Sequence, residues 1–143
     1  MDLVSIIIPY YKKKKYISTT INSAISQSYK NIEIIIVYDD ENYDDLKLLE
    51  EIKKKDERIR IIKNKKKMGA GLSRNIGISS STGNYIAFLD ADDTWEADKL
   101  SKQMSFMTDN NYLASHTSYQ IVDEYRNIIA VSYTHLRAHE TSP

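Results

Sequence analysis

The feature that most constrains the fold is a regular alternation between short apolar segments and longer amphipathic ones. Four runs rich in β-branched and aromatic residues have the length of strands, at residues 4–9, 32–37, 59–62 and 85–89. Helical spacing of apolar residues follows each of them, in segments 18–27, 44–55 and 72–76 and in the stripe Leu100, Met104 and Met107. This alternation predicts an α/β protein built from βαβ units, with a mainly parallel sheet flanked by helices.

Polar residues follow three of the predicted strands, at the point where each strand ends. Tyr10 and Tyr11 come after the first strand, Asp39 and Asp40 after the second, and the acidic segment 90–93 after the fourth. Ligands of parallel sheets bind beyond the carboxyl ends of the strands. We therefore expect these side chains to surround one ligand site.

The acidic segment is the strongest local signal of a ligand. Asp90, Asp92 and Asp93 follow an apolar strand directly, and neighbouring carboxylates repel one another unless a positive charge lies between them. Residues two apart in extended backbone face the same way, so Asp90 and Asp92 can meet one ligand. A divalent ion that carries a phosphorylated ligand satisfies this arrangement, and Mg²⁺ or Mn²⁺ is the ion we expect. Asp93 either adds to the site or caps a helix that begins at Trp95.

Composition excludes several other classes of protein. The chain has 143 residues, enough for one domain, and its 20 basic residues balance 20 acidic ones, which favours neither nucleic acid nor a membrane surface as partner. Cysteine is absent, which excludes disulfides and thiolate metal sites. No signal peptide or membrane-spanning segment is recognisable, so we expect a cytoplasmic protein. Lysines cluster at residues 12–15, at residues 53–55, and at residue 63 together with residues 65–67. Such clusters favour solvated surface, with a polyanion-binding patch as the alternative.

Four motifs, in this order and spacing, resemble those of the family 2 glycosyltransferases of GT-A fold. They are IIIPYY (6–11), QSYKNIEIIIVYDD (27–40), GLSRNIG (71–77) and GNYIAFLDADD (83–93), and the resemblance covers roughly residues 2–119. It implies a Rossmann-like nucleotide-diphospho-sugar transferase fold, here incomplete. It also implies metal-dependent, inverting transfer of a sugar from a nucleotide sugar, with UDP the expected nucleotide. The implied acceptor is a hydroxyl of a saccharide or lipid-linked saccharide, in cell-surface polysaccharide or glycolipid synthesis.

The resemblance implies that Pro9, Tyr11 and Asp39 bind the nucleotide, with Asp39 accepting a hydrogen bond from the base. The chain reads YDDEN at 38–42 where the family has Asp-Asp-Gly-Ser, so the register between Asp39 and Asp40 is open by one residue. Each residue also has a structural alternative. Asp39 could cap a turn, and Tyr11 could be a partly buried tyrosine.

The resemblance also implies roles around the phosphates. Arg74 lies near the nucleotide, where its guanidinium can pair with phosphate or with the acids after the fourth strand, and its structural alternative is a surface arginine. Asp90 matches the ribose or phosphate environment, while Asp92 and Asp93 match the metal site. Gly69 and Gly71 are expected to serve a backbone turn.

We expect residues 1–130 to form the donor-binding half-domain and residues 131–143 to be a non-native tail. The tail departs from the family pattern and looks like an in-frame translation of a sequencing adapter, so His135 and His139 receive no role and the tail should pack poorly. The family's catalytic base lies beyond the point where this chain stops. His116, a lone histidine just past the fifth predicted strand, is expected to be structural, so the chain itself should bind nucleotide without transferring a sugar.

Two other functions remain open at this point. A sugar-1-phosphate nucleotidyltransferase would share the sheet and the acids, but it needs a glycine- and arginine-rich loop after the first strand, where this chain has residues 9–13, PYYKK. A non-catalytic nucleotide-binding module would share the pocket and lack only the chemistry.

Overall fold

The computed structural model describes residues 1–132 and 137–139, and the chain divides into two compact units, residues 1–97 and 98–143. The first unit contains, in order, β1 (Val4–Tyr10), α1 (Lys14–Ile25), β2 (Ile32–Tyr38), α2 (Leu46–Lys53), β3 (Ile59–Lys63), α3 (Ala70–Ser80) and β4 (Tyr85–Phe88). The predicted α/β class is confirmed. Helix α1 begins earlier than its apolar stripe indicated, because the carbonyl of Lys13 already accepts the N–H groups of Tyr16 and Ile17.

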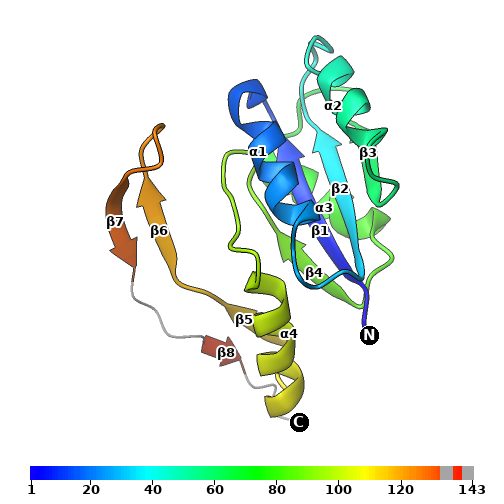
Figure 1. Ribbon diagram of the computed structural model, residues 1–143. Helices are drawn as coiled ribbons and strands as arrows, with labels where there is room; N and C mark the ends of the chain where they lie inside the picture. The colour runs from blue at the N-terminus through cyan, green and yellow to red at the C-terminus, as the bar shows by residue number, and fades with distance from the viewer. Residues whose placement is uncertain (133–136, 140–143) are drawn as a thin grey trace. The chain divides into compact units, whose positions relative to one another are not determined.

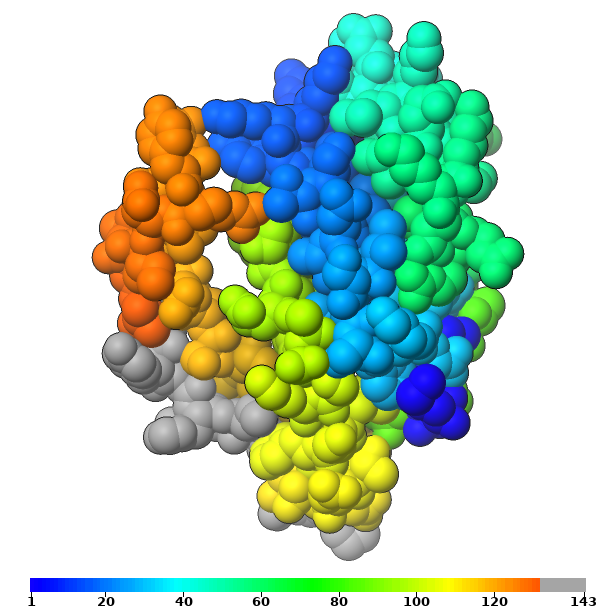
Figure 2. Space-filling view, viewed as in Figure 1, coloured from blue at the N-terminus to red at the C-terminus, as the bar shows by residue number. Residues whose placement is uncertain are grey.

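The four strands form one parallel sheet in the order β3-β2-β1-β4. The chain moves outward from β1 to β3 and then returns to the other side of β1. Right-handed crossovers consequently place α1 and α2 on one face of the sheet and α3 on the other (Figure 1). The space-filling view shows α1 and α2 covering much of their face (Figure 2). A reversal of this kind opens a crevice at the carboxyl ends of β1 and β4.

The core lies on both faces of β1 and β2, whose central isoleucines are fully buried. On the face covered by α3, Ile7, Ile35 and Val37 form a cluster to which Ile76 of the helix packs. Gly77 of α3 lies against this cluster, since a Cβ there would stand 2.5 Å from Cγ2 of Ile7. The missing side chain thus lets α3 approach β1 closely, and this approach sets the position of the helix start at the ligand edge.

A polar network closes the amino ends of the strands, away from the ligand edge. Glu33 of β2 accepts hydrogen bonds from Ser5 Oγ (2.6 Å), from the backbone N–H of Thr82 (2.6 Å) and from Arg60 Nη1 (3.0 Å). Burial alone would raise the pKa of Glu33, but the hydrogen bonds from these partners outweigh it and hold the pKa below its ordinary value. Glu33 therefore fastens β1, β3 and the turn before β4 to β2.

The second unit contains α4 (Lys99–Asn110), β5 (Ala114–His116), β6 (Tyr119–Val122), β7 (Ile128–Ser132) and β8 (Arg137–His139). Antiparallel pairs join β5 to β8 and β6 to β7. Helix α4 begins at Lys99, so the predicted helix start at Trp95 was wrong. His116 is the last residue of β5 and does not follow it.

The proposed non-native tail, residues 131–143, is described only in part. Its first two residues end β7 and residues 137–139 form β8, while His135 lies outside the described residues. The origin of this segment stays a prediction. Within the described ranges, no helix is both long enough and apolar enough to cross a membrane.

Candidate functional site

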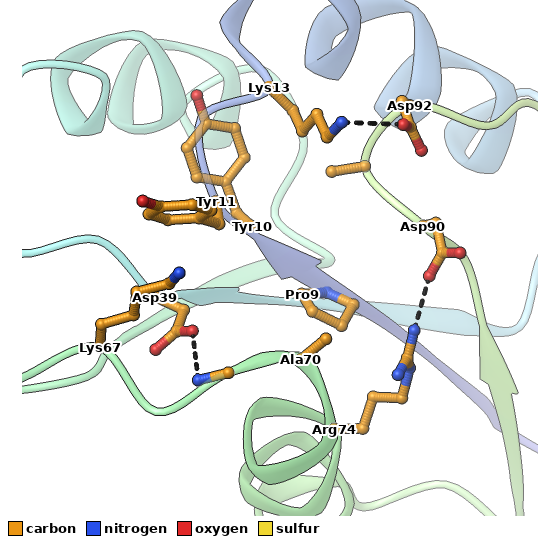
Figure 3. A pocket seen from close by; sticks show the side chains of 12 residues that line it. Pro9, Tyr10, Tyr11, Lys13, Asp39, Lys67, Ala70, Arg74, Asp90 and Asp92 are labelled. Atoms are coloured by element: carbon orange, nitrogen blue, oxygen red, sulfur yellow. Dashed lines mark hydrogen bonds and ion pairs between the residues drawn. The ribbon is translucent and has the colours of Figure 1, made fainter.

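A pocket of about 420 Å³ opens at the carboxyl edge of the parallel sheet, a volume typical of small-ligand sites. Turns after β1, β2 and β4 and the start of α3 supply its walls, all within the first unit (Figure 3). It brings together six of the eight residues singled out from the sequence, namely Pro9, Tyr11, Asp39, Arg74, Asp90 and Asp92. Asp40 and Asp93 are not among its lining residues.

Asp39 forms the buried end of the pocket, with only 2 % of its surface exposed. Its Oδ1 accepts hydrogen bonds from the N–H of Met68 (2.6 Å) and from Asn64 Nδ2 (2.9 Å), and its Oδ2 accepts the N–H of Gly69 (2.8 Å). A carboxylate can accept about four hydrogen bonds, so Oδ2 retains the capacity to accept a donor from a ligand. Asp39 thus holds the turn before α3 and still faces the pocket.

Asp40, one residue further, has a different task. It is buried, and its Oδ1 accepts the backbone N–H of Asn42 at 3.0 Å, the local side-chain bond that stabilises many turns. Of the two neighbouring acids, Asp39 therefore lines the pocket, while Asp40 stabilises its own turn.

Two consecutive tyrosines differ in their exposure to the pocket. Tyr10 is buried, stacks on Tyr38 at 5.3 Å between ring centroids, and donates its hydroxyl to Asp45 at 2.6 Å. Burial, together with the carboxylate of Asp45, raises the pKa of Tyr10. Tyr11 is half-buried, and the ammonium of Lys67 lies 3.8 Å from its ring centroid. The ammonium of Lys12 also lies over this ring, 5.2 Å from its centroid, so a planar ligand could stack on Tyr11 by displacing one of the two lysines.

The acidic end of the pocket lies across from Asp39 and Tyr11 (Figure 3). Asp90 accepts a hydrogen bond from Arg74 at 2.9 Å, and Asp92 forms an ion pair with Lys13 at 3.0 Å. All four side chains are at least one-third exposed, and such exposed pairs contribute only about 0–1 kcal/mol to stability. Both pairs can therefore exchange for contacts with a charged ligand at little cost.

Asp93 does not line the pocket. The residue as a whole is exposed, but partial desolvation of its carboxyl group raises the pKa of Asp93, and the neighbouring carboxylates of Asp92 and Asp90 add to the effect. The alternative role of Asp93, as the cap of a helix that begins at Trp95, was wrong, because α4 begins only at Lys99, after Asp98.

The donor set at the acidic end fits an ion that shares its ligands with a phosphate. Among the residues that the structure describes, no three acidic or histidine side chains come close enough together to form a metal cage. Asp90 and Asp92 nonetheless both present carboxylates to the pocket. Mg²⁺ bound with nucleotides takes one or two carboxylates from the protein and its remaining ligands from phosphates and water. Two carboxylates at the open end of this pocket meet that requirement.

Backbone features fix the walls of the site. Gly69, at the start of α3, has a φ of +89°, a conformation that favours glycine, and it lines the pocket together with the first residue of the helix. The hydroxyl of Thr20 on α1 donates to the carbonyl of Ala91 at 2.9 Å. This bond ties the acidic turn to α1.

Sequence reasoning missed the two lysines that line the pocket, Lys13 and Lys67. Both belong to lysine clusters for which solvated surface was favoured over a polyanion-binding patch, and most members of those clusters are exposed. The available signal was position, because Lys13 follows the first strand by three residues at the edge where the acids gather.

Comparison with known proteins gives a consistent result. The family described as Glycosyl transferase family 2 matches residues 5–139. A glycosyltransferase of Rickettsia felis is 46 % identical over 121 residues, which is 85 % of this chain and 20 % of that protein. The Escherichia coli UDP-Glc:alpha-D-GlcNAc-diphosphoundecaprenol beta-1,3-glucosyltransferase WfaP is 44 % identical over 125 residues, or 87 % of this chain and 49 % of that protein. The Bacillus subtilis putative teichuronic acid biosynthesis glycosyltransferase TuaG is 38 % identical over 84 % of this chain and 48 % of its own length.

Solved structures show the same fold. Staphylococcus aureus TarS 1–349 in complex with UDP-GlcNAc superposes with a TM-score of 0.70 at 23 % identity, over 76 % of this chain and 32 % of that one. The Pyrobaculum calidifontis mannosyltransferase PcManGT, in complex with GDP-Man and Mn²⁺, gives 0.69 at 17 % identity, over 74 % and 32 %. The predicted GT-A fold is confirmed. The chain spans from about a fifth to about half of the length of these relatives.

Proposed function

The chain belongs to glycosyl transferase family 2, and from that premise we propose that it forms the donor-binding part of an inverting, metal-dependent glycosyltransferase. The donor is a nucleoside-diphosphate sugar, with UDP as the nucleotide. The acceptor is a hydroxyl group of a saccharide or lipid-linked saccharide in cell-surface polysaccharide or glycolipid synthesis. The observation that carries the proposal is one pocket that joins the buried carboxylate of Asp39 to the exposed carboxylates of Asp90 and Asp92.

The names of the relatives support this choice of donor and acceptor. WfaP is named for transfer from UDP-Glc to a diphosphoundecaprenol-linked sugar, and TuaG for teichuronic acid biosynthesis. The structural neighbours are complexes with UDP-GlcNAc in one case and with GDP-Man and Mn²⁺ in the other. The fold therefore accommodates different bases, and the specificity for one base must come from the residues that line the pocket.

Asp39 and Tyr11 form the base end of the site. Oδ2 of Asp39 accepts the N3–H of uracil, and the ring of Tyr11 provides the stacking area. In cytosine, N3 is a hydrogen-bond acceptor and carries no hydrogen. Two acceptors, N3 and the buried carboxylate, would then face each other without a hydrogen bond. A site built to hydrogen-bond one group rejects an analogue that lacks it. UDP should therefore bind more tightly than CDP.

Arg74 and the start of α3 form the phosphate end. The guanidinium of Arg74 can donate to phosphate oxygens once it leaves Asp90, and the first N–H groups of a helix favour an anion. Asp90 and Asp92 would hold Mn²⁺ or Mg²⁺. When bound, such an ion stabilises the negative charge of the departing nucleoside diphosphate.

Inverting transfer also needs a carboxylate base that deprotonates the acceptor. In the proposal this base belongs to the part of the longer relatives that this chain does not span. The chain alone therefore binds the donor nucleotide without transferring the sugar. Sugar transfer by the 143-residue chain would contradict this part of the proposal.

Isothermal titration calorimetry of the full chain with UDP, CDP, GDP and dTDP, each with and without Mn²⁺, tests the proposal. We expect UDP to bind more tightly when Mn²⁺ is present and to bind at least about tenfold more tightly than CDP, the difference that one unsatisfied buried polar group produces. Absence of UDP binding in the presence of Mn²⁺ would overturn the proposal. Equal affinity for UDP and CDP would overturn the role of Asp39.

A further inference from the structure

The ion pair between Lys13 and Asp92 implies a second function for the lysine. We infer that Lys13 is a diphosphate-binding residue that is held by Asp92 while no metal ion is bound, and that it moves to the donor diphosphate when Asp92 becomes a metal ligand. This inference rests on the proposed function, and Lys13 is a diphosphate-binding residue in addition to those that the family resemblance implies.

The geometry places the lysine at the phosphate end of the pocket. Its Nζ lies 3.0 Å from Oδ2 of Asp92, and both residues line the cavity (Figure 3). The two side chains are 42 % and 41 % exposed, so the pair is weak and can exchange. Asp92 therefore binds the ammonium of Lys13 in a pair that another cation can replace.

The backbone keeps the ammonium near the pocket after the exchange. The carbonyl of Lys13 accepts hydrogen bonds from the N–H groups of Tyr16 and Ile17, both at 3.0 Å, and these are the first hydrogen bonds of α1. The Cα is thus fixed at the rim, while the four-carbon stem lets the ammonium turn. Two cations repel each other at one carboxylate, so the ammonium must leave Asp92 when a divalent ion binds there. A diphosphate in the same pocket offers the nearest new negative charge.

Position distinguishes Lys13 from the rest of its lysine run. Of Lys12 to Lys15, all within the described residues, Lys13 is the one that lines the pocket. Lys12 lies over the ring of Tyr11, with Nζ 5.2 Å from the centroid, and Lys14 is exposed at the start of α1. Lys14 therefore provides a matched control with the same charge, one residue away.

The test compares Lys13→Met with Lys14→Met, since methionine keeps an unbranched stem and removes the charge. Calorimetry measures binding of Mn²⁺ alone, of UDP with saturating Mn²⁺, and of uridine. In Lys13→Met we expect UDP to bind about 10-fold more weakly, the lower end of the range for a charged hydrogen bond. Mn²⁺ alone should bind about 2- to 5-fold more tightly, because its competitor is gone. Uridine affinity should not change, and Lys13→Arg should restore UDP binding.

The expected changes in UDP affinity and in Mn²⁺ affinity have opposite signs, and this distinguishes the proposed role of Lys13 from a structural one. If the lysine only stabilised the acidic turn, its replacement would weaken the binding of both Mn²⁺ and UDP. Any result in Lys13→Met other than weaker UDP binding with tighter Mn²⁺ binding, or the same changes in Lys14→Met, overturns the inference. If the unaltered chain binds no UDP with Mn²⁺, the proposed function fails as well, and the two failures are thus distinguishable.

Discussion

The close packing of α3 on β1 can be tested by replacing two glycines of the same helix. Gly77 faces the core, and a Cβ there would lie 2.5 Å from Cγ2 and 3.2 Å from Cγ1 of Ile7. Gly71 is exposed, and a Cβ there would meet nothing within 4 Å. Gly77→Ala and Gly71→Ala therefore make the same chemical change in two different environments.

The expected effects have opposite signs. Replacing glycine by alanine in a helix stabilises it by about 0.5–1 kcal/mol when nothing else changes, and this is the expected result for Gly71→Ala. Ile7 is fully buried and β-branched, so it cannot easily turn away from a new methyl group. Overpacking of this kind costs about 1–3 kcal/mol. Gly77→Ala should therefore be less stable than Gly71→Ala by about 2 kcal/mol.

Urea unfolding followed by the fluorescence of Trp95, the single tryptophan and a residue of the first unit, measures the difference. Since α3 also carries Arg74 to the pocket, Gly77→Ala should weaken UDP binding with Mn²⁺ by displacing the helix. If Gly77→Ala is as stable as Gly71→Ala, the helix does not approach the strand as closely as described, and the account of how α3 is positioned fails.

Three further predictions concern single side chains. Glu33→Gln should destabilise the chain by about 1–3 kcal/mol at neutral pH. Because folding lowers the pKa of Glu33, this loss of stability should persist above the ordinary carboxyl range and fade as the pH falls through the lowered pKa. Urea titrations at several pH values measure the loss, and a loss that does not depend on pH would contradict the prediction. Asp92→Asn should weaken UDP binding in Mn²⁺ by at least about tenfold and remove its metal dependence, whereas Asp109→Asn, on the exposed side of α4, should change neither in calorimetry. Tyr11→Ala should weaken binding of both UDP and uridine by about tenfold or more, as loss of base stacking does, with the exposed Tyr16→Ala as control; unchanged uridine affinity would remove Tyr11 from the base site.

The sequence predicted the strands well because their signal is local and strong. A run such as residues 32–38, with every member buried, is typical of a strand covered on both faces. The parallel arrangement then brings the carboxyl ends together, so Asp39 and Asp90 could be assigned to one edge before any coordinates. Their separation along the chain does not matter, since the topology alone makes them neighbours.

The details of the site depended on tertiary contacts that no local pattern contains. Asp39 and Asp40 are adjacent and chemically identical, and only the N–H groups of Met68 and Gly69 decide which one faces the pocket. Lys13 has the same side chain as its neighbours, and its role follows from the position of Asp92, far along the sequence. Asp93 is next to Asp92 and has the same side chain, yet only Asp92 lines the pocket.

The two ends of the pocket differ in rigidity, and the difference suits a donor site. At the base end, Asp39 is buried and bound to the turn before α3, and Asn64 joins it to Ser73 of the helix through bonds of 2.9 and 3.2 Å. A base that binds there meets a position already ordered, which reduces the entropy lost on binding. At the phosphate end, exposed ion pairs hold the acids, and such pairs exchange readily. A nucleotide sugar would therefore be selected at the rigid end, while its charged leaving group would be bound and released at the adaptable one.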